Sequence, residues 1–122
     1  MSDAPRPVAR LDELERATFI AHETIFELRS ALIREELTTP RADALLAESA
    51  RITLHDVPAL AEPLRRLASR WHEQLIFAPD DLQEIEAKLG DAVADVEPQL
   101  QALLRRQAEI AAELRAALRA PR

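Results

Sequence analysis

The chain has 122 residues and a formal net charge of −6, a balance that argues against nucleic acid as the main partner. The absence of cysteine excludes disulfides, thiolate metal sites and a cysteine nucleophile. Leucine and alanine dominate, with one glycine and no tyrosine, a composition typical of an all-α protein with a single core. No apolar run reaches the length of a membrane span and no basic-then-apolar leader opens the chain, so we expect a cytoplasmic protein without a membrane partner.

The chain begins with a segment that has few core-forming residues. Residues 1–10 include Pro5 and Pro7, and we expect a flexible N-terminal arm there. We expect residues 11–122 to form a single all-α helical bundle domain of about four helices.

The first predicted helix spans about residues 11–37 and carries two apolar lines. Its inner line has steps of three and four and comprises Leu11, Leu14, Thr18, Ala21, Ile25, Leu28 and Leu32. A second line, with steps of seven, comprises Phe19, Phe26 and Ile33. Because both lines are apolar, we expect this helix to bury two faces at the centre of a bundle.

Two shorter helices follow. Thr39 is a good N-cap residue and Pro40 suits the first helical position, which predicts a helix over about 40–54. Pro58 and Pro63 are five residues apart and cannot both be early positions of one straight helix. We therefore expect a break around residues 55–61 and a third helix over about 63–77.

The last predicted helix, about 80–119, shows a heptad pattern sustained over about five heptads. Its apolar phase passes through Gly90 and Pro98 without a shift, which favours one helix kinked near Pro98. The alternative is a break at Gly90 with a new helix starting at Pro98. Asp80 followed by Gln83 resembles a capping box at the start.

This last helix is predicted to be longer than the helices that pack against it. Two short helices cannot cover its full length, so we expect the seam beyond Leu103 to stay exposed within one chain. Residues 80–97 hold seven acids and one lysine, whereas 99–122 hold five arginines and two acids, which suits either the helix macrodipole or an antiparallel copy. We expect a homodimer, or another protein chain as the partner. The predicted interface comprises Val96, Leu100, Leu103, Arg106, Ile110, Leu114 and Leu118.

A polar line lies between the two apolar lines of the first helix. It is either a stripe that faces a ligand in the bundle core, or a set of residues whose stems cover apolar surface while their heads reach water. The densest cluster of functional residue types lies farther along, at residues 71–73. The candidate ligand-binding residues are Glu15, His22, Arg29, Trp71 and His72.

Spacing gives no support to metal or nucleophilic chemistry. None of the three histidines stands in a Glu-x-x-His or His-x-x-x-His pattern, and Gly90, the only glycine, cannot build a phosphate loop. We expect no metal, no cofactor and no catalytic residue. The leading hypothesis is a non-catalytic α-helical interaction module, of the adaptor, chaperone or regulator type, that self-associates through the last helix. The alternative hypothesis is a helical bundle that binds a small molecule or cofactor along the polar line of the first helix, and an enzyme is one form of this alternative.

Overall fold

The computed structural model of the chain describes residues 6–120, and the elements in this range are helical. The prediction of an all-α bundle is confirmed. In chain order the elements are α1 (Arg6–Arg34), α2 (Pro40–Arg51), the π-helical turn η1 (Ile52–Asp56), α3 (Val57–Phe77), the 3₁₀ turn η2 (Pro79–Asp81) and α4 (Leu82–Arg119).

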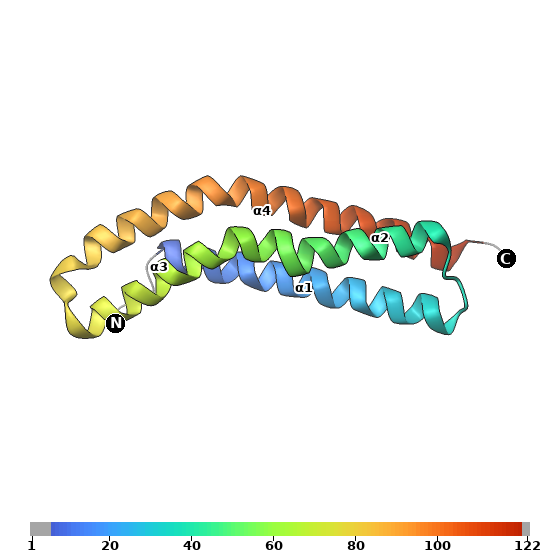
Figure 1. Cartoon of the computed structure of the whole chain (residues 1–122), viewed down its shortest axis with the longest axis horizontal. Helices are drawn as coiled ribbons and strands as arrows, with labels where there is room; N and C mark the ends of the chain where they lie inside the picture. Colours follow the sequence, from blue (N-terminus) through green and yellow to red (C-terminus); the bar gives the residue numbers. More distant parts are fainter. Residues whose placement is uncertain (1–5, 121–122) are drawn as a thin grey trace.

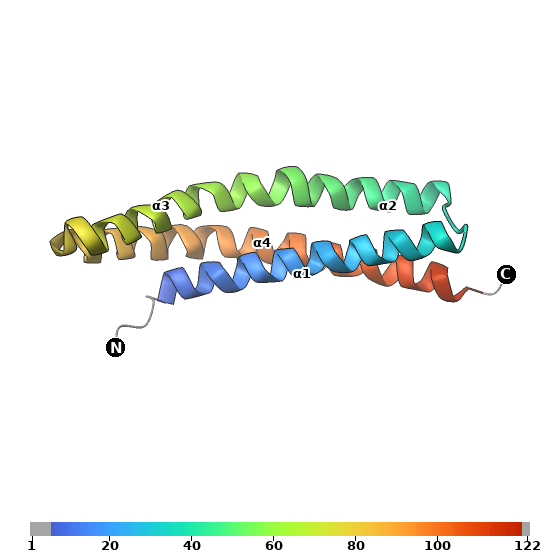
Figure 2. The same cartoon turned by 90° about the horizontal axis from the view of Figure 1, so that it is seen from below.

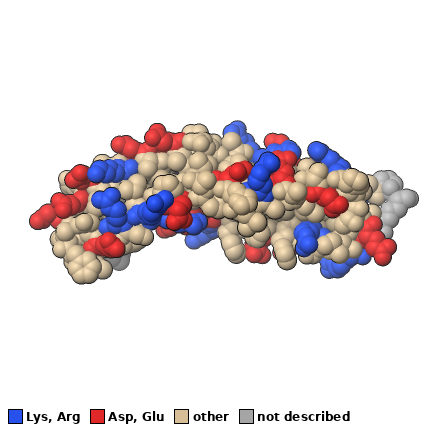
Figure 3. Space-filling view, in the orientation of Figure 1, with Lys and Arg blue, Asp and Glu red and all other residues tan. Residues whose placement is uncertain are grey.

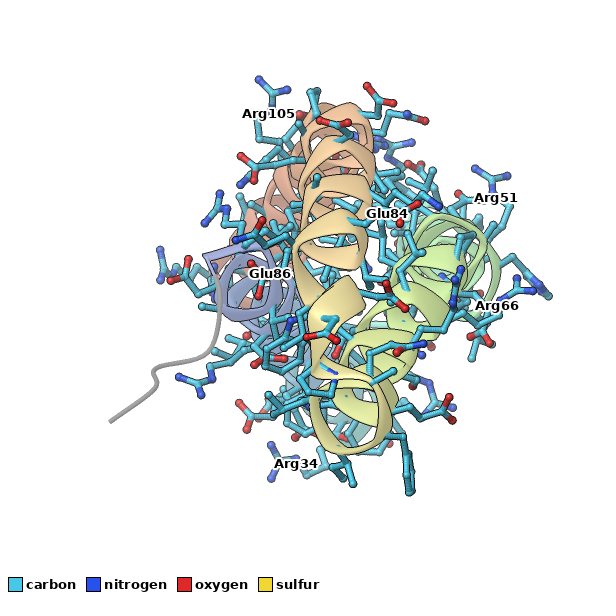
Figure 4. All side chains as sticks on the ribbon, turned by 90° about the vertical axis from the view of Figure 1, so that its left-hand side faces the viewer. Arg34, Arg51, Arg66, Glu84, Glu86 and Arg105 are labelled. Atoms are coloured by element: carbon cyan, nitrogen blue, oxygen red, sulfur yellow. The ribbon has the colours of Figure 1, made fainter. Side chains whose placement is uncertain are left out.

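The elements form three long rods that lie side by side (Figure 1). One rod is α1, the second is α2, η1 and α3 joined end to end, and the third is α4. The rods α1 and α4 run in the same direction, and the second rod runs in the opposite direction (Figures 1 and 2). α4 packs against α1 and α3 more extensively than α1 packs against α2 or α3. Viewed end-on, α1, α3 and α4 stand at the corners of a triangle (Figure 4).

The predicted break at residues 55–61 is wrong, because the chain stays helical from α2 through η1 into α3. In the π turn the Val57 N–H donates to the Ile52 carbonyl, five residues back. This wider turn ends at Asp56, and Pro58, which lies in the first turn of α3, has no N–H that needs an acceptor. The three segments, of 12, 5 and 21 residues, together match the 38 residues of α4.

α4 is one helix through Gly90 and Pro98, so the alternative of a break at Gly90 is wrong. Figure 1 shows α4 as an arch with its highest point near the middle of the helix. The predicted capping box is also wrong: Asp80 lies in η2, and Asp81, the residue before α4, makes no capping hydrogen bond with its side chain. The 3₁₀ turn after Pro79 starts the helix instead, with the Asp81 N–H donating to the Ala78 carbonyl at 3.2 Å.

The first helix begins and ends earlier than predicted. α1 starts at Arg6 and Val8 is buried in the core, so the arm prediction is wrong for residues 6–10, while residues 1–5 lie outside the described range. A proline is tolerated in the first helical turn, because no N–H is needed there. At its other end α1 is closed by Glu36, whose φ is 56°, and by the Leu37 N–H, which donates to the Leu32 carbonyl at 2.9 Å.

The core has two clusters, and together they cover the α4 seam from end to end. The first gathers the start of α1, α3 and the first half of α4: Val8, Leu11, Leu14, Leu64, Trp71, Ile85, Leu89, Val93 and Leu100. The second gathers the end of α1, α2 and the second half of α4: Ile25, Leu32, Ala42, Leu45, Ile52, Ile110, Ala111 and Leu114.

The predicted uncovered seam is therefore wrong. Ile110 and Leu114 are 0% and 1% exposed within a single chain, and Leu100 is also buried. The other predicted interface residues, Val96, Leu103, Arg106 and Leu118, are partly buried. The physical reason is the continuous second rod, which brings α2 alongside the C-terminal half of α4 together with the end of α1.

Replacing Gly90 with alanine tests how closely α1 and α4 pack. The φ of Gly90 is not positive, and an added Cβ would meet the Pro7 ring at 3.5 Å, an ordinary contact. Glycine inside a helix costs about 0.5–1 kcal/mol relative to alanine. We expect Gly90→Ala to raise the free energy of unfolding by about that amount in a urea titration. A loss of stability would show that α1 lies closer to Gly90 than the 3.5 Å contact with Pro7 indicates.

Candidate functional site

A cavity of about 330 Å³ lies between α1, the η1–α3 junction and α4. All three rods contribute to its wall, so it exists only in the folded bundle. Its lining residues are Glu15, Thr18, Phe19, Ala21 and His22 of α1, Ile52, Thr53, Val57, Pro58 and Arg65 of the second rod, and Leu103, Leu104 and Gln107 of α4.

The cavity forms at a level of the bundle where each rod has a small or polar residue among those that face the other two rods. The inner line of α1 has Thr18 and Ala21 at this level, η1 has Thr53, and the α4 seam has Gln107 in place of an aliphatic residue. Side chains of this size leave space that leucine or isoleucine would fill. The two core clusters lie on either side of this level.

Gln107 is the buried polar group of the cavity, with 4% of its surface exposed. Its Nε2 donates to Thr53 Oγ1 at 3.1 Å and to the Ser49 carbonyl at 3.5 Å. Its Oε1 is buried and has no hydrogen-bond partner among the described residues. An unsatisfied buried acceptor costs about 1–3 kcal/mol, so Gln107 Oε1 lowers the stability of the bundle at this level.

Two predicted ligand-binding residues reach the rim of this cavity. Glu15 accepts a hydrogen bond from Arg65 Nε at 2.6 Å, which ties α1 to α3. Thr18 Oγ1 donates to the Glu15 carbonyl at 2.8 Å, and the exposed His22 lies on the same side of α1. The rim of the cavity therefore carries the ion pair between Glu15 and Arg65, with His22 beside it.

The other three predicted residues lie elsewhere, which corrects the proposed grouping. Arg29 is exposed on α1 and does not line the cavity. Trp71 is buried in the first core cluster, and its Nε1 donates to Glu86 Oε1 at 2.9 Å. His72 is exposed, and its ring lies against Trp71 with 4.9 Å between the ring centroids. Sequence reasoning missed the role of Gln107, although a polar residue in an apolar seam was the available signal.

A second feature is a row of exposed apolar side chains on α1. Phe19, Phe26 and Ile33 are 62%, 53% and 50% exposed, and they stand seven residues apart on one side of the helix. These residues form what we call the α1 row. The prediction that α1 buries both of its apolar lines is therefore wrong within a single chain. The second line lies outside the contact with α4, which α1 makes through its inner line.

Another exposed apolar group lies at the turn between α3 and α4. Leu75, Ile76 and Phe77 end α3 and are largely exposed. In Figure 3 this turn is the left-hand end of the molecule, where uncharged surface gathers at the lower edge. Acidic side chains line the upper left edge of the same view. The α1 row and this turn thus belong to different elements of the chain.

Ion pairs join the rods on the outside of the bundle. Arg106, one of the predicted interface residues, instead donates two hydrogen bonds to Glu48 of α2 within the same chain. These hydrogen bonds lower the pKa of the Glu48 carboxyl. The pair thus favours the folded chain at neutral pH and loses this contribution as the pH falls through the pKa of Glu48. Arg51, Arg66 and Arg105, in contrast, point outward from their rods (Figure 4).

Metal chemistry and membrane crossing find no support in the described range. Residues 6–120 contain no group of three or more histidine, aspartate or glutamate side chains placed to hold a metal ion. Within the same residues, no helix has both the length and the apolar character that crossing a bilayer requires.

Comparisons with protein-family models, curated proteins and solved structures find no match to this chain. The class that the geometry defines is an elongated three-rod helical bundle with a cavity at mid-length and an exposed apolar row on α1.

Proposed function

We propose that the protein is a non-catalytic helical interaction module that pairs with a second copy of itself through the α1 row. The observation that carries the proposal is the exposure of Phe19, Phe26 and Ile33 at a regular spacing. Large apolar side chains gathered on one face of a helix are typical of protein–protein contact sites. The surface differs from the one expected from sequence, because the α4 seam is occupied within the chain.

The size of the α1 row indicates a reversible contact. With half or more of each side chain exposed, the row presents about 300 Å² of apolar surface per chain. A standard interface takes about 800 Å² from each partner. The row would therefore form the apolar centre of a contact whose rim is polar, and dilution should separate the two copies.

The spacing of the row suits pairing with itself. Phe19 and Ile33 are each seven residues from Phe26. In an antiparallel pair centred on Phe26, Phe19 of one copy lies opposite Ile33 of the other, and the two Phe26 rings meet on the symmetry axis. Residues 16–36 contain three arginines and four glutamates, so two copies of this segment bring together a nearly neutral surface. A near-neutral surface favours a second copy over a strongly charged partner.

Replacing Phe26 with serine tests the proposal. Because Phe26 is largely exposed, the variant should keep its fold and, at concentrations at which both chains are monomeric, its melting temperature. Each dimer loses two rings at its centre, so we expect the dissociation constant to rise by at least about tenfold. The measurement is solution mass by light scattering or sedimentation across a dilution series.

Phe77→Ser is the matched control, since Phe77 is also exposed but lies at the α3–α4 turn. It should leave the dissociation constant unchanged. Weaker pairing in Phe77→Ser with normal pairing in Phe26→Ser would move the interface to the turn. A wild-type chain that stays monomeric at every concentration would overturn pairing with a second copy.

A further inference from the structure

We propose that the cavity between α1, the η1–α3 junction and α4 receives Ile33 of the second copy, so that each chain of the pair closes the cavity of the other. The inference rests on the self-association proposed above, and it adds a contact outside the α1 row. It is carried by the edge that the row and the cavity share, by the level of Ile33 in the antiparallel pair, and by the apolar area that the row alone lacks.

The α1 row and the cavity share one edge of α1. Phe19 belongs to the row and also lines the cavity, and its side chain is largely exposed. His22, three residues farther along α1, is likewise exposed and lines the cavity. Because these two wall residues are exposed, the cavity opens on the side of α1 from which the row projects. A helix that packs against the row therefore lies over the opening.

The antiparallel register places Ile33 of the second copy at this opening. In a pair centred on Phe26, residues that lie opposite each other are equally far from Phe26 along their chains. Phe19 and Ile33 are each seven residues from Phe26, so they lie opposite each other. The α1 residues of the cavity wall run from Glu15 to His22, with Phe19 near the middle of this stretch. Ile33 of the second copy thus meets the cavity at its middle level.

The cavity offers Ile33 both space and apolar neighbours. Its volume of about 330 Å³ is more than the four carbons of an isoleucine side chain occupy. Its wall includes Ile52 and Val57 of the second rod and Leu103 and Leu104 of α4. An isoleucine side chain that enters this space leaves water and gains carbon neighbours from more than one rod.

The rim of the cavity suits an uncharged side chain. Glu15 accepts a hydrogen bond from Arg65 Nε at 2.6 Å, so the two charges at the rim offset each other. A charged side chain would compete with this ion pair and lose its hydration against the apolar part of the wall. Ile33 does neither.

The cavity also supplies apolar area that the row lacks. The row presents about 300 Å² of apolar surface per chain, whereas a standard interface takes about 800 Å² from each partner. On insertion, Ile33 contacts the cavity wall as well as Phe19, and the two-fold symmetry of the pair repeats this contact in the other chain. The insertion therefore enlarges the apolar centre of the interface twice in every dimer.

Replacing Thr18 with leucine tests the insertion, because Thr18 lines the cavity but does not belong to the α1 row. The larger side chain takes up space in the cavity, so that Ile33 of the second copy no longer fits. Since each dimer then loses two insertions, we expect the dissociation constant to rise by about tenfold or more. The measurement is sedimentation or light scattering of the full chain across a dilution series.

Thr24→Leu is the matched control. Thr24 is the same residue type on the same helix, but it lines a groove between α1 and α4 that does not include Phe19 or His22. It should leave the dissociation constant unchanged. Ile33→Ala adds a second comparison: in the Thr18→Leu chain it should raise the dissociation constant by a smaller factor than in the wild type, because the insertion is already lost.

Nuclear Overhauser effects test the geometry in the wild-type pair. In a mixture of two differently labelled wild-type chains, we expect effects between the Ile33 methyl groups of one chain and the Val57 methyl groups of the other. If Thr18→Leu fails to fold, this measurement decides alone.

The outcomes separate the insertion from the pairing itself. If the wild type pairs but Thr18→Leu pairs as tightly as Thr24→Leu, or if the effects between Ile33 and Val57 are absent, the insertion is wrong and the pairing stands. A wild-type chain that stays monomeric at every concentration would overturn the pairing, and the insertion with it.

Discussion

Replacing Ile110 with alanine should lower the free energy of unfolding by about 3 kcal/mol. Ile110 is fully buried in the second core cluster, where Leu32 of α1 and Leu45 of α2 also lie. The substitution removes three carbons and leaves a cavity that these neighbours can fill only in part. Because the contacts lie within one chain, the loss should be the same at every protein concentration. Urea titrations at two concentrations measure it.

Ile76→Ala is the matched control for this substitution, because Ile76 is 72% exposed at the end of α3. We expect it to change the free energy of unfolding by less than about 1 kcal/mol. If Ile110→Ala instead left the monomer stable and weakened only self-association, the α4 seam would be an interface between chains.

Replacing Pro98 with alanine should raise the free energy of unfolding by about 1–3 kcal/mol. Pro98 lies inside α4, where it has no N–H for the Ala94 carbonyl and its ring crowds that carbonyl. Alanine restores the hydrogen bond. Part of the gain is offset, because alanine makes the unfolded chain more flexible than proline does. Thermal and urea unfolding measure the net change.

Pro40→Ala provides the comparison, since Pro40 occupies the first turn of α2, where no N–H is required. We expect Pro40→Ala to cause a small loss of stability, because alanine gives the unfolded chain more conformational freedom than proline does. Equal effects at the two positions would mean that the helix interior at Pro98 carries no penalty, which would contradict an unbroken α4.

The path of α4 was predictable from the sequence, and its burial was not. The heptad phase from Leu89 through Val93 to Leu100 is a local signal, and it correctly indicated one helix through Gly90 and Pro98. Burial depends on what lies opposite, which is a property of the whole fold. The spacing of Pro58 and Pro63 suggested a break, and a break left too little helix to cover α4.

The π turn η1 could not be predicted from the spacing of the prolines or of the apolar residues. It places one additional residue in the turn ahead of Pro58, so that the rod continues with little loss of hydrogen bonds. The longer rod then carries Leu45 and Ile52 to the C-terminal half of α4. The same local change brings Thr53 to Gln107 and so helps to create the cavity.

The candidate site was predictable only in part, for a related reason. Glu15 and His22 share one side of α1 by helical spacing, and both reach the cavity rim. Arg29 follows the same spacing but lies past the level of the cavity. Gln107 was visible as a polar residue in an apolar seam, yet only the packing of three rods shows that its Oε1 lacks a partner.

The measurement that tests most directly whether one chain covers its own α4 seam is amide hydrogen exchange over residues 99–118, followed across a wide dilution range. The account predicts that these amides stay protected at concentrations at which the protein is monomeric, because α1 and α2 hold this half of α4 in place. Protection that fades as the protein is diluted would contradict it, because a second chain would then be required to cover the seam.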